Sequence, residues 1–216
     1  MGSELGAVRD LEVQRDRLRD HAARLPPPEA DAARRVIRRL DADRTAAKAN
    51  LLTMLNQPRY AQLRVQLRSA ATGPTFTTAA RKPARAALAA VVRSRWKKVR
   101  AAVRLLGDNP PDEALHAVRV RAKRCRYAAE ACEPIFGKRS RRLARAMANV
   151  QDVLGEHHDA VVASAWLAKT AHECSPAEAY AIGMLAQIER DAAAAARAEF
   201  PTVWRRIDTK RVHGWL

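Results

Sequence analysis

The sequence predicts an all-α protein. Aromatic residues make up only 5% of the 216 residues, Gly occurs only eight times, and Ala, Leu, Arg and Glu recur at helical spacings. Hydrophobic residues make up 48% of the chain and charged residues are dispersed among them, which excludes disorder of the whole chain. Together these observations favour antiparallel helical bundles, in which long helices are joined by short breaks.

Clusters of Pro and Gly mark where the predicted helices end. The clusters lie at Pro26–Pro28, Thr72–Pro74, Gly107–Pro111, Glu133–Pro134 and Ser175–Pro176. Asp112 and Ser175 suit helix N-caps, and Pro176 suits a first helical turn. The helices predicted between these breaks span 3–24, 29–70 with a bend near Pro58, 79–106, 112–132, 138–171, 177–197 and a short tail around 201–209.

The net charge of +17 predicts a polyanionic partner. Forty Lys and Arg residues are balanced by only 23 Asp and Glu residues, and a folded chain tolerates such an excess poorly without a partner or salt. The sign of the charge does not separate DNA, RNA, an anionic membrane and inorganic polyphosphate. Charge alone favours nucleic acid.

The three cysteines predict neither a disulfide nor a metal site. Cys125 and Cys132 lie seven residues apart on one predicted helix, too far to bridge at ~1.5 Å rise per residue. Only Cys174 remains, so no zinc-type cluster can form, and we expect no metal and no cofactor. No run of about 18 apolar residues and no signal-peptide core occurs, so we expect a cytoplasmic protein with no membrane partner.

A repeated motif relates the start of the chain to a later segment. Residues 5–13 and 154–162 share the pattern L-G-x-x-x-D-x-x-V at a constant offset of 149 residues (154 − 5). A Gly inside a helix is unfavourable by about 1 kcal/mol and is usually kept for close helix approach. We therefore predict two related copies of one helical unit.

The helix predicted over 112–132 has one apolar and one largely basic face. At 100° per residue, the apolar stripe consists of Leu115, Val118, Ala122, Cys125, Ala129 and Cys132. The opposite stripe consists of His116, Arg119, Lys123, Tyr127 and Glu130, flanked by Arg124 and Arg126. The apolar stripe predicts a member of a bundle, and the other stripe places its cations within about three helical turns.

The next predicted helix repeats this arrangement. One of its faces carries Lys138, Arg141, Arg142, Arg145, Asn149 and Asp152, and the other carries Leu143, Met147, Val150 and Leu154. Ten Lys or Arg but only two Glu lie between His116 and Arg145. A charge run is often only a solvated helix face, but this one lacks the alternating Glu–Lys pairs that usually stabilise such a face. The one-sided charge therefore favours a ligand, and Arg can hold two phosphate oxygens at once.

Two motifs in this region resemble those of a known family. Residues 116–130 resemble the H-x-x-R-x-x-x-K-R-x-R-Y-x-x-E signature of CHAD domains, and residues 150–159 resemble the L-Q-D-x-L-G-x-x-x-D segment of the same family. The resemblance implies two related helical bundles with pseudo-two-fold symmetry, whose basic faces surround a pore or groove that binds inorganic polyphosphate. It also implies association with polyphosphate granules.

The resemblance also implies which residues contact the anion. By motif position these are His116, Arg119, Lys123, Arg124 and Arg126, with Tyr127 and Glu130 orienting them. The helical wheel adds Lys138, Arg142 and Arg145. A second group is either another basic wall or a solvated face, and the sequence leaves both interpretations open: Arg34, Arg35, Arg38 and Arg39.

The sequence departs from the family pattern at its start. A complete member carries an H-x-x-R helix in each half, and the first should lie 38 residues (154 − 116) before its L-G segment, which here begins at Leu5. We therefore expect residues 1–78 to be a partial first helical half and residues 79–216 to be the second half, which carries the motif. A truncated fragment, a misassigned start and the tail of a longer protein, such as one with a CYTH domain, all stay open. An exposed apolar face on the first helix would favour a homodimer or a rearranged first half.

Three functions compete at this point. Binding of polyphosphate without reaction is the leading hypothesis, non-specific nucleic-acid binding by the same surface is the alternative, and a phosphohydrolase acting on polyphosphate comes third. A phosphoryl-transfer enzyme normally needs carboxylates that hold magnesium, and no such cluster is predicted at the site. His157 and His158 point about 100° apart on a helix, so structural roles are favoured over a metal site. We therefore predict a binding protein with no catalytic residue.

Overall fold

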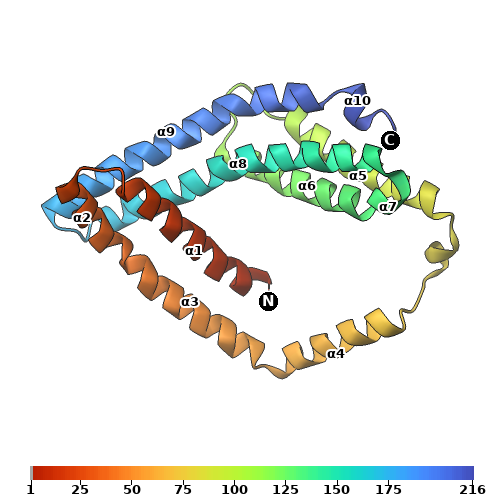
Figure 1. The fold of residues 1–216 in the computed structure, drawn as a ribbon, viewed down its shortest axis with the longest axis horizontal. Coiled ribbons are helices and arrows are strands. Elements are labelled where there is room, and N and C mark those ends of the chain that lie inside the picture. Colours follow the sequence, from red (N-terminus) through yellow and green to blue (C-terminus); the bar gives the residue numbers. More distant parts are fainter. Residues whose placement is uncertain (1) are drawn as a thin grey trace. The chain divides into compact units, whose positions relative to one another are not determined.

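Residues 2–216 of a computed structural model, apart from the Ala79 side chain, fold into helices and turns with no strand among them (Figure 1). This confirms the all-α prediction. The elements are α1 (Gly2–Ala22), α2 (Pro27–Ile37), α3 (Arg39–Leu55), α4 (Pro58–Thr72), the 3-10 turn η1 (Thr78–Arg81), α5 (Ala84–Arg104), α6 (Asp112–Ala131), α7 (Glu133–Phe136), α8 (Lys138–Ala171), α9 (Pro176–Ile207) and α10 (Lys210–His213). None of these helices combines the length and the apolar composition that crossing a membrane requires.

Two predicted helical segments differ from the structure. The helix predicted over 29–70 is three helices, because the chain breaks at Arg38 and again before Pro58, whose ring disfavours helical backbone in the residue before it. Conversely, α9 continues through Pro201, so the two helices predicted on either side of it are one. A proline removes a single backbone hydrogen bond there, and burial of Phe200 and Ile207 anchors both sides.

The two predicted N-caps had different outcomes. Ser175 caps α9 as expected: its hydroxyl accepts from the Glu178 N–H at 3.4 Å, and the Glu178 carboxylate accepts from the Ser175 N–H at 3.1 Å. These hydrogen bonds lower the pKa of Glu178. Asp112 is not the N-cap of α6, because that position is occupied by Pro111 and Asp112 is already helical.

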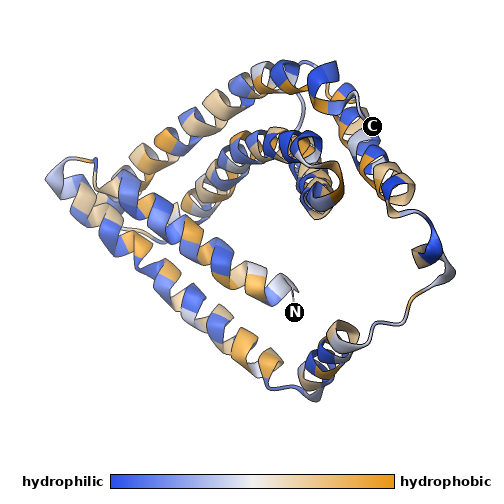
Figure 2. Ribbon diagram, turned by 45° about the vertical axis from the view of Figure 1, so that its right-hand side comes forward, coloured by the Kyte–Doolittle hydropathy of each residue, from blue (hydrophilic) through white to orange (hydrophobic). Residues whose placement is uncertain are grey.

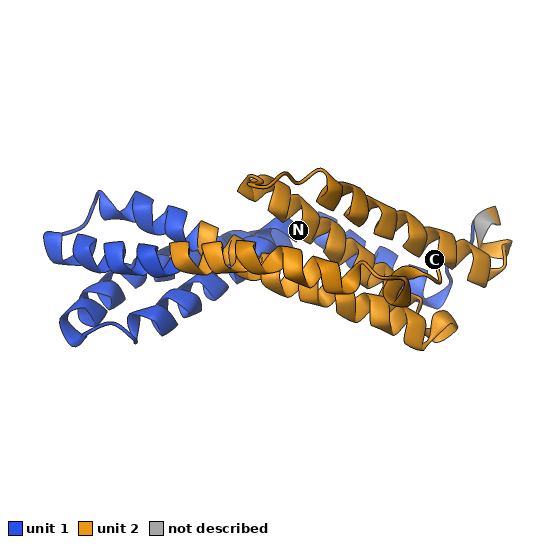
Figure 3. Ribbon diagram, turned by 90° about the horizontal axis from the view of Figure 1, so that it is seen from above, with its two compact units in different colours: residues 1–77, 162–189 blue, residues 78–161, 190–216 orange. Residues whose placement is uncertain are grey.

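The chain forms two compact units (Figure 3). Unit 1 contains the residues through Thr77 together with Val162–Glu189, and unit 2 contains Thr78–Val161 together with Arg190–Leu216. Helices α8 and α9 therefore contribute to both units. These units are defined by packing, whereas the predicted division into 1–78 and 79–216 is defined by sequence relationship, so that division stays a prediction.

The core of unit 1 is assembled from matching positions of the repeat. Helices α1 and α8 end, and α2 and α9 begin, at positions 149 residues apart: Ala22 and Ala171, then Pro27 and Pro176. The same offset relates five pairs of buried residues in this core: Leu18 and Leu167, Ala32 and Ala181, Ala33 and Ile182, Val36 and Leu185, and Ile37 and Ala186. The repeat therefore extends well beyond the motif from which it was predicted.

One matched position breaks this pattern. Leu40 is fully buried, and its counterpart 149 residues later is Glu189, which is also fully buried. The Glu189 carboxylate accepts from Arg17 Nε at 2.7 Å and lies 2.9 Å from His21 Nδ1. Because a buried carboxylate is costly unless it is paired, these two α1 side chains are what allow Glu189 to occupy a core position.

Unit 2 buries the apolar stripe that the sequence predicts on α6. Its members Leu115, Val118, Ala122, Cys125, Ala129 and Cys132 are all at most 1% exposed. They pack with buried residues of α5, α8 and α9, among them Trp96, Met147 and Phe200. Figure 2 shows hydrophobic and hydrophilic residues alternating along these helices, as expected where one face packs and the other is solvated. The other face of α6 is thereby left outside the core.

Candidate polyanion-binding site

The first turn of α6 is held in unit 2 by an ionic cluster. Asp112 Oδ1 accepts a hydrogen bond from Arg197 Nη2 of α9 and lies 3.2 Å from Nε2 of His157 on α8. His157 is buried, and burial lowers its pKa, opposed by the attraction of Asp112. His157 therefore has a structural role in fixing the start of the motif helix.

The next turn of α6 meets α8 through the two motif residues His116 and Arg119. The His116 ring lies 4.3 Å from the His158 ring, centroid to centroid, with their planes tilted by 42°. A Cβ atom on Gly155 would lie only 3.5 Å from Arg119 Nε and 3.7 Å from Nη2. The Arg119 guanidinium therefore lies next to Gly155 of α8, with room there for a methyl group but not for a large side chain. The two sequence motifs thus meet at this contact.

Several polar atoms of the motif helix and of α8 are buried. His116 Nδ1, Arg119 Nε and Arg126 Nε on α6, and Gln151 Oε1 on α8, are buried and have no hydrogen-bond partner among the described residues. Buried polar atoms are nearly always hydrogen-bonded in proteins, and exceptions tend to mark functional positions. Three of these four atoms are nitrogens of motif residues, which is the arrangement that an anionic ligand would satisfy.

Further along α6, Tyr127 and Glu130 hold two of the cations. The Lys123 ammonium lies 6.0 Å and the Arg126 guanidinium 5.1 Å from the centre of the Tyr127 ring. Arg126 Nε also lies 3.3 Å from a Glu130 oxygen. Lys123 is exposed and Tyr127 is 48% exposed, so this part of the face is open to solvent.

The cations predicted on α8 are arranged less uniformly. Lys138 and Arg145 are exposed and form no ion pair among the described residues. Arg142 donates to the Arg211 carbonyl at 3.1 Å, so it points toward α10. Arg141 is paired with Glu133, with Nε at 2.7 Å from the carboxylate. Only Lys138 and Arg145 are therefore free to add to the α6 face.

Arg124 lies apart from the motif face, although the motif includes it. It lines a groove between α5 and α6 together with Arg95, Lys98 and Arg121. The sequence analysis did not select these last three cations. On the helical wheel of α6, Arg121 lies on the same flank as Arg124. That position was the signal that could have identified Arg121 as a neighbour of Arg124.

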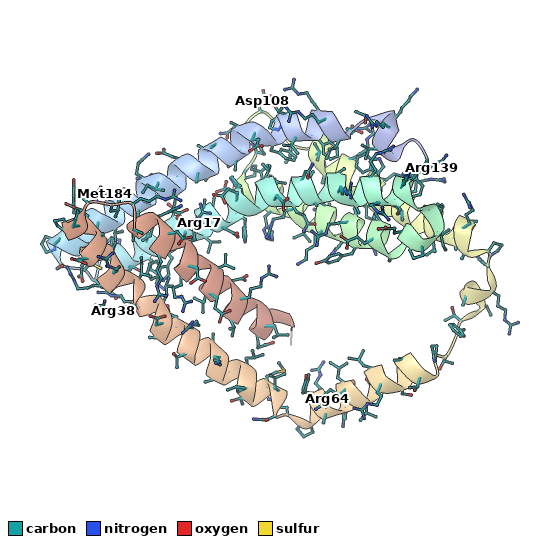
Figure 4. The ribbon with its side chains drawn as sticks, in the orientation of Figure 1. Arg17, Arg38, Arg64, Asp108, Arg139 and Met184 are labelled. Carbon is teal, nitrogen blue, oxygen red and sulfur yellow. The ribbon has the colours of Figure 1, made fainter. Side chains whose placement is uncertain are left out.

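The predicted second wall in unit 1 is largely paired with carboxylates. Arg34 forms a salt bridge with Asp31. Arg35 lies 3.5 Å from Glu178, and Arg39 lies 3.8 Å from Glu173. Arg38, labelled in Figure 4, is exposed and forms no ion pair within residues 2–216. Its three neighbours already have acidic partners, so a polyanion would have to compete with them.

Comparison with known proteins identifies the family of this all-helical chain with its cationic, motif-bearing helix. A sequence model of the CHAD domain matches residues 1–168. The chain belongs to the CHAD family, as its two motifs predicted.

The chain is also similar to two curated proteins and to a solved structure. The chain is 30% identical over 216 residues to the uncharacterised protein MT2285 of Mycobacterium tuberculosis (strain CDC 1551 / Oshkosh), covering 96% of the chain and 41% of that protein. It is 30% identical over 212 residues to the uncharacterised protein Rv2226 of strain ATCC 25618 / H37Rv, covering 94% and 40%. The chain thus spans about two fifths of the length of these relatives. The structure of PptA from Streptomyces chartreusis matches with a TM-score of 0.77 and 26% identity, over 94% of this chain and 75% of that one.

Proposed function

We propose that the motif face of unit 2 binds inorganic polyphosphate by ionic contacts, without chemical reaction. This face consists of His116, Arg119, Lys123 and Arg126 on α6 with Lys138 and Arg145 on α8. The observation that carries the proposal is the pair of buried nitrogens without a hydrogen-bond partner, His116 Nδ1 and Arg119 Nε, where the motif helix meets α8 at His158 and Gly155.

The spacing of these cations suits an extended anion. Arg119, Lys123 and Arg126 recur every three or four residues, which places neighbours about 5–6 Å apart along one side of a helix. A chain of phosphates presents charge continuously along its length, so it can engage several of these groups at once. Binding is then multivalent, and the release of counterions makes it dependent on salt.

Duplex DNA and RNA are the alternative ligands for the same face. Single-stranded nucleic acid is often bound by stacking its bases on aromatic side chains. The exposed aromatic residue beside the motif face is Tyr127, and its ring already lies against Lys123 and Arg126. Association with polyphosphate granules and a cytoplasmic location follow from the same proposal. A CYTH domain in a longer parent protein is compatible with it.

Competition at one fixed salt concentration tests the ligand. Labelled long-chain polyphosphate bound to the protein should be displaced by unlabelled polyphosphate at least about tenfold more effectively than by duplex DNA at equal phosphate concentration. Equal or better displacement by DNA would assign the face to nucleic acid instead.

Incubation with substrate tests the absence of reaction. Polyphosphate, inorganic triphosphate or ATP with magnesium should release no phosphate above a heat-denatured control, because the proposed face lacks a carboxylate cluster that holds the metal. Steady phosphate release that disappears in His116→Ala would assign a hydrolase instead.

A further inference from the structure

The groove between α5 and α6 is a second cationic feature of unit 2, separate from the motif face. It has a volume of about 620 Å³ and nine lining residues of two kinds. Four are cations: Arg95, Lys98, Arg121 and Arg124. Five are apolar: Ala101, Ala102, Leu105, Ala117 and Val120.

The cations of the groove form no ion pairs with the carboxylates of the described residues. Within residues 2–216, Arg95, Lys98 and Arg124 form no ion pair, and Arg121 donates to the Ala117 carbonyl of its own helix at 2.9 Å. Elsewhere on α5, by contrast, Arg100 lies 3.3 Å from a carboxylate oxygen of Asp208. The positive charge in the groove is therefore uncompensated and would attract an acidic ligand.

The apolar floor of the groove distinguishes among acidic ligands. Leu105 is 86% exposed, and Ala101 is also exposed to solvent. A phosphate chain has no apolar surface, so it would cover these side chains without gaining from their burial. A helix with an apolar ridge would bury them and place acidic residues beside the cations at once.

The length of the groove suits a helix of about four turns. A second hollow of about 490 Å³ continues it along α5, sharing Lys98 and Ala101 and adding Ala90, Arg93, Ser94 and Lys97. From Ala90 to Leu105 the two hollows follow α5 for about 22 Å at 1.5 Å per residue. Small side chains at Ala90, Ser94 and Ala101 leave room for close approach along this path.

We propose that the α5–α6 groove docks an amphipathic helix of a partner protein, with an apolar ridge flanked on both sides by Asp or Glu. The ridge lies on Ala101, Leu105 and Ala117, and the flanking carboxylates pair with Lys98 of α5 and Arg121 and Arg124 of α6. Such a partner is attached to unit 2 without occupying the motif face. The inference does not rest on polyphosphate binding.

A designed peptide provides the probe for this groove. A fluorescein-labelled synthetic helix of about 16 residues carries Leu along one ridge at spacings of three and four residues, with Glu on both flanks. A control peptide has the same composition with Leu and Glu shuffled. Fluorescence anisotropy in about 0.15 M salt, where long-range attraction is screened, should show at least about tenfold tighter binding of the amphipathic peptide.

Matched charge reversals locate the binding. Lys98→Glu/Arg121→Glu should weaken peptide binding at least about tenfold, whereas Arg119→Glu/Lys123→Glu, with the same charge change on the motif face, should alter it less than about threefold. Ala101→Gln, which changes an apolar residue of the groove without changing its charge, should weaken peptide binding several-fold. This variant tests the groove even if a charge-reversal variant fails to fold.

Two kinds of result would overturn this proposal. Equal binding of the shuffled peptide, or equal losses in the two reversal variants, would show general attraction to a basic protein. A loss of polyphosphate affinity that is greater in Lys98→Glu/Arg121→Glu than in Arg119→Glu/Lys123→Glu would assign the groove to polyphosphate. The second result would also move the proposed polyphosphate site, whereas the first would leave that site untouched.

Discussion

The arginines of the two units differ in what surrounds them. Three of the four arginines of the second wall in unit 1 lie beside a carboxylate: Arg34, Arg35 and Arg39. On the motif face of unit 2, among the described residues, only Arg126 forms an ion pair, and Arg119 and Arg145 form none. Exposed ion pairs contribute only about 0–1 kcal/mol each to stability, but they remove local positive charge. The number of arginines on a helix is therefore a poor guide to a polyanion site, and the distribution of carboxylates is a better one.

The two copies of the repeat also differ in how they are covered. Leu154 is 1% exposed in unit 2, and its counterpart Leu5 is 48% exposed in unit 1. Phe200 is 4% exposed, whereas Leu51, which lies 149 residues earlier, is only half-buried. Helix α4 has no buried residue at all. The same motif is therefore enclosed in one copy and open in the other, and the homodimer that would cover the open copy stays a prediction.

The largest expected effect concerns the buried carboxylate of unit 1. Glu189→Ala should lower the free energy of unfolding by about 3–5 kcal/mol, because it leaves the Arg17 guanidinium and the His21 ring without their buried partner. Chemical denaturation monitored by circular dichroism measures this loss.

A triple variant tests whether the two copies of the repeat pack in the same way. Arg17→Trp/His21→Thr/Glu189→Leu gives this side of the core the residues found 149 positions away, at Trp166, Thr170 and Leu40. Because buried ion pairs are often replaced by apolar residues without loss, its stability should fall within about 1 kcal/mol of the parent. A loss as large as that of Glu189→Ala would show that the two copies do not pack equivalently.

The same substitution at Gly155 and at its counterpart Gly6 should have different effects on polyphosphate affinity. Gly155→Leu places a large side chain where the guanidinium lies, so polyphosphate affinity should fall about tenfold. Gly6→Leu, at the matching position of α1, meets only Asp10 at 4.0 Å and should leave affinity unchanged.

An alanine variant at Gly155 provides the control for this comparison. An added methyl group at Gly155 would be in ordinary contact with Arg119, so Gly155→Ala should keep affinity and gain up to ~1 kcal/mol of helix stability. Equal loss of binding in Gly155→Leu and Gly6→Leu would contradict a specific role for the Arg119 contact.

Much of this arrangement could be predicted from the sequence because helical periodicity determines faces. The α6 stripe from Leu115 to Cys132 is buried as the 100° wheel requires, and Tyr127 and Glu130 lie beside the cations that they were expected to orient. Periodicity does not determine which neighbouring helix lies beside each side of a given helix. It therefore could not place Arg124 in a groove with α5 or turn Arg142 toward α10.

Ion pairs between segments that are distant in the chain also could not be predicted from the sequence. Nothing local predicts that Arg35 lies beside Glu178 or that Arg197 binds Asp112, because 143 (178 − 35) and 85 residues separate the partners. The break at Arg38 and the continuation through Pro201 depend on tertiary packing in the same way.

A smaller effect should appear in the pH dependence of unit 2. Burial lowers the pKa of His157 below its value in the unfolded chain, so the unfolded state takes up a proton first as pH falls below about 6.5. Stability contributed by neutral His157 is therefore complete above that pH and declines below it. His157→Gln should show a shallower decline between pH 7 and 5 in thermal unfolding, and an identical decline in both proteins would exclude His157 as its source.

The central claim is that the cations of the motif face, rather than net charge, bind polyphosphate. Two triple variants remove the same three charges from different helices: Arg119→Ala/Lys123→Ala/Arg126→Ala on α6 and Arg59→Ala/Arg64→Ala/Arg68→Ala on α4. The three α4 residues are exposed, and that helix buries no residue, so the α4 variant disturbs no core contact; Arg64 is labelled in Figure 4.

Titration of both variants with long-chain polyphosphate over a series of salt concentrations is the direct measurement. The α6 variant should lose at least about 100-fold in affinity, and the slope of log K against log salt should flatten by about two to three, while the α4 variant stays within about threefold of the parent. Equal affinities of the two variants would contradict the assignment of the motif face and leave net charge as the explanation.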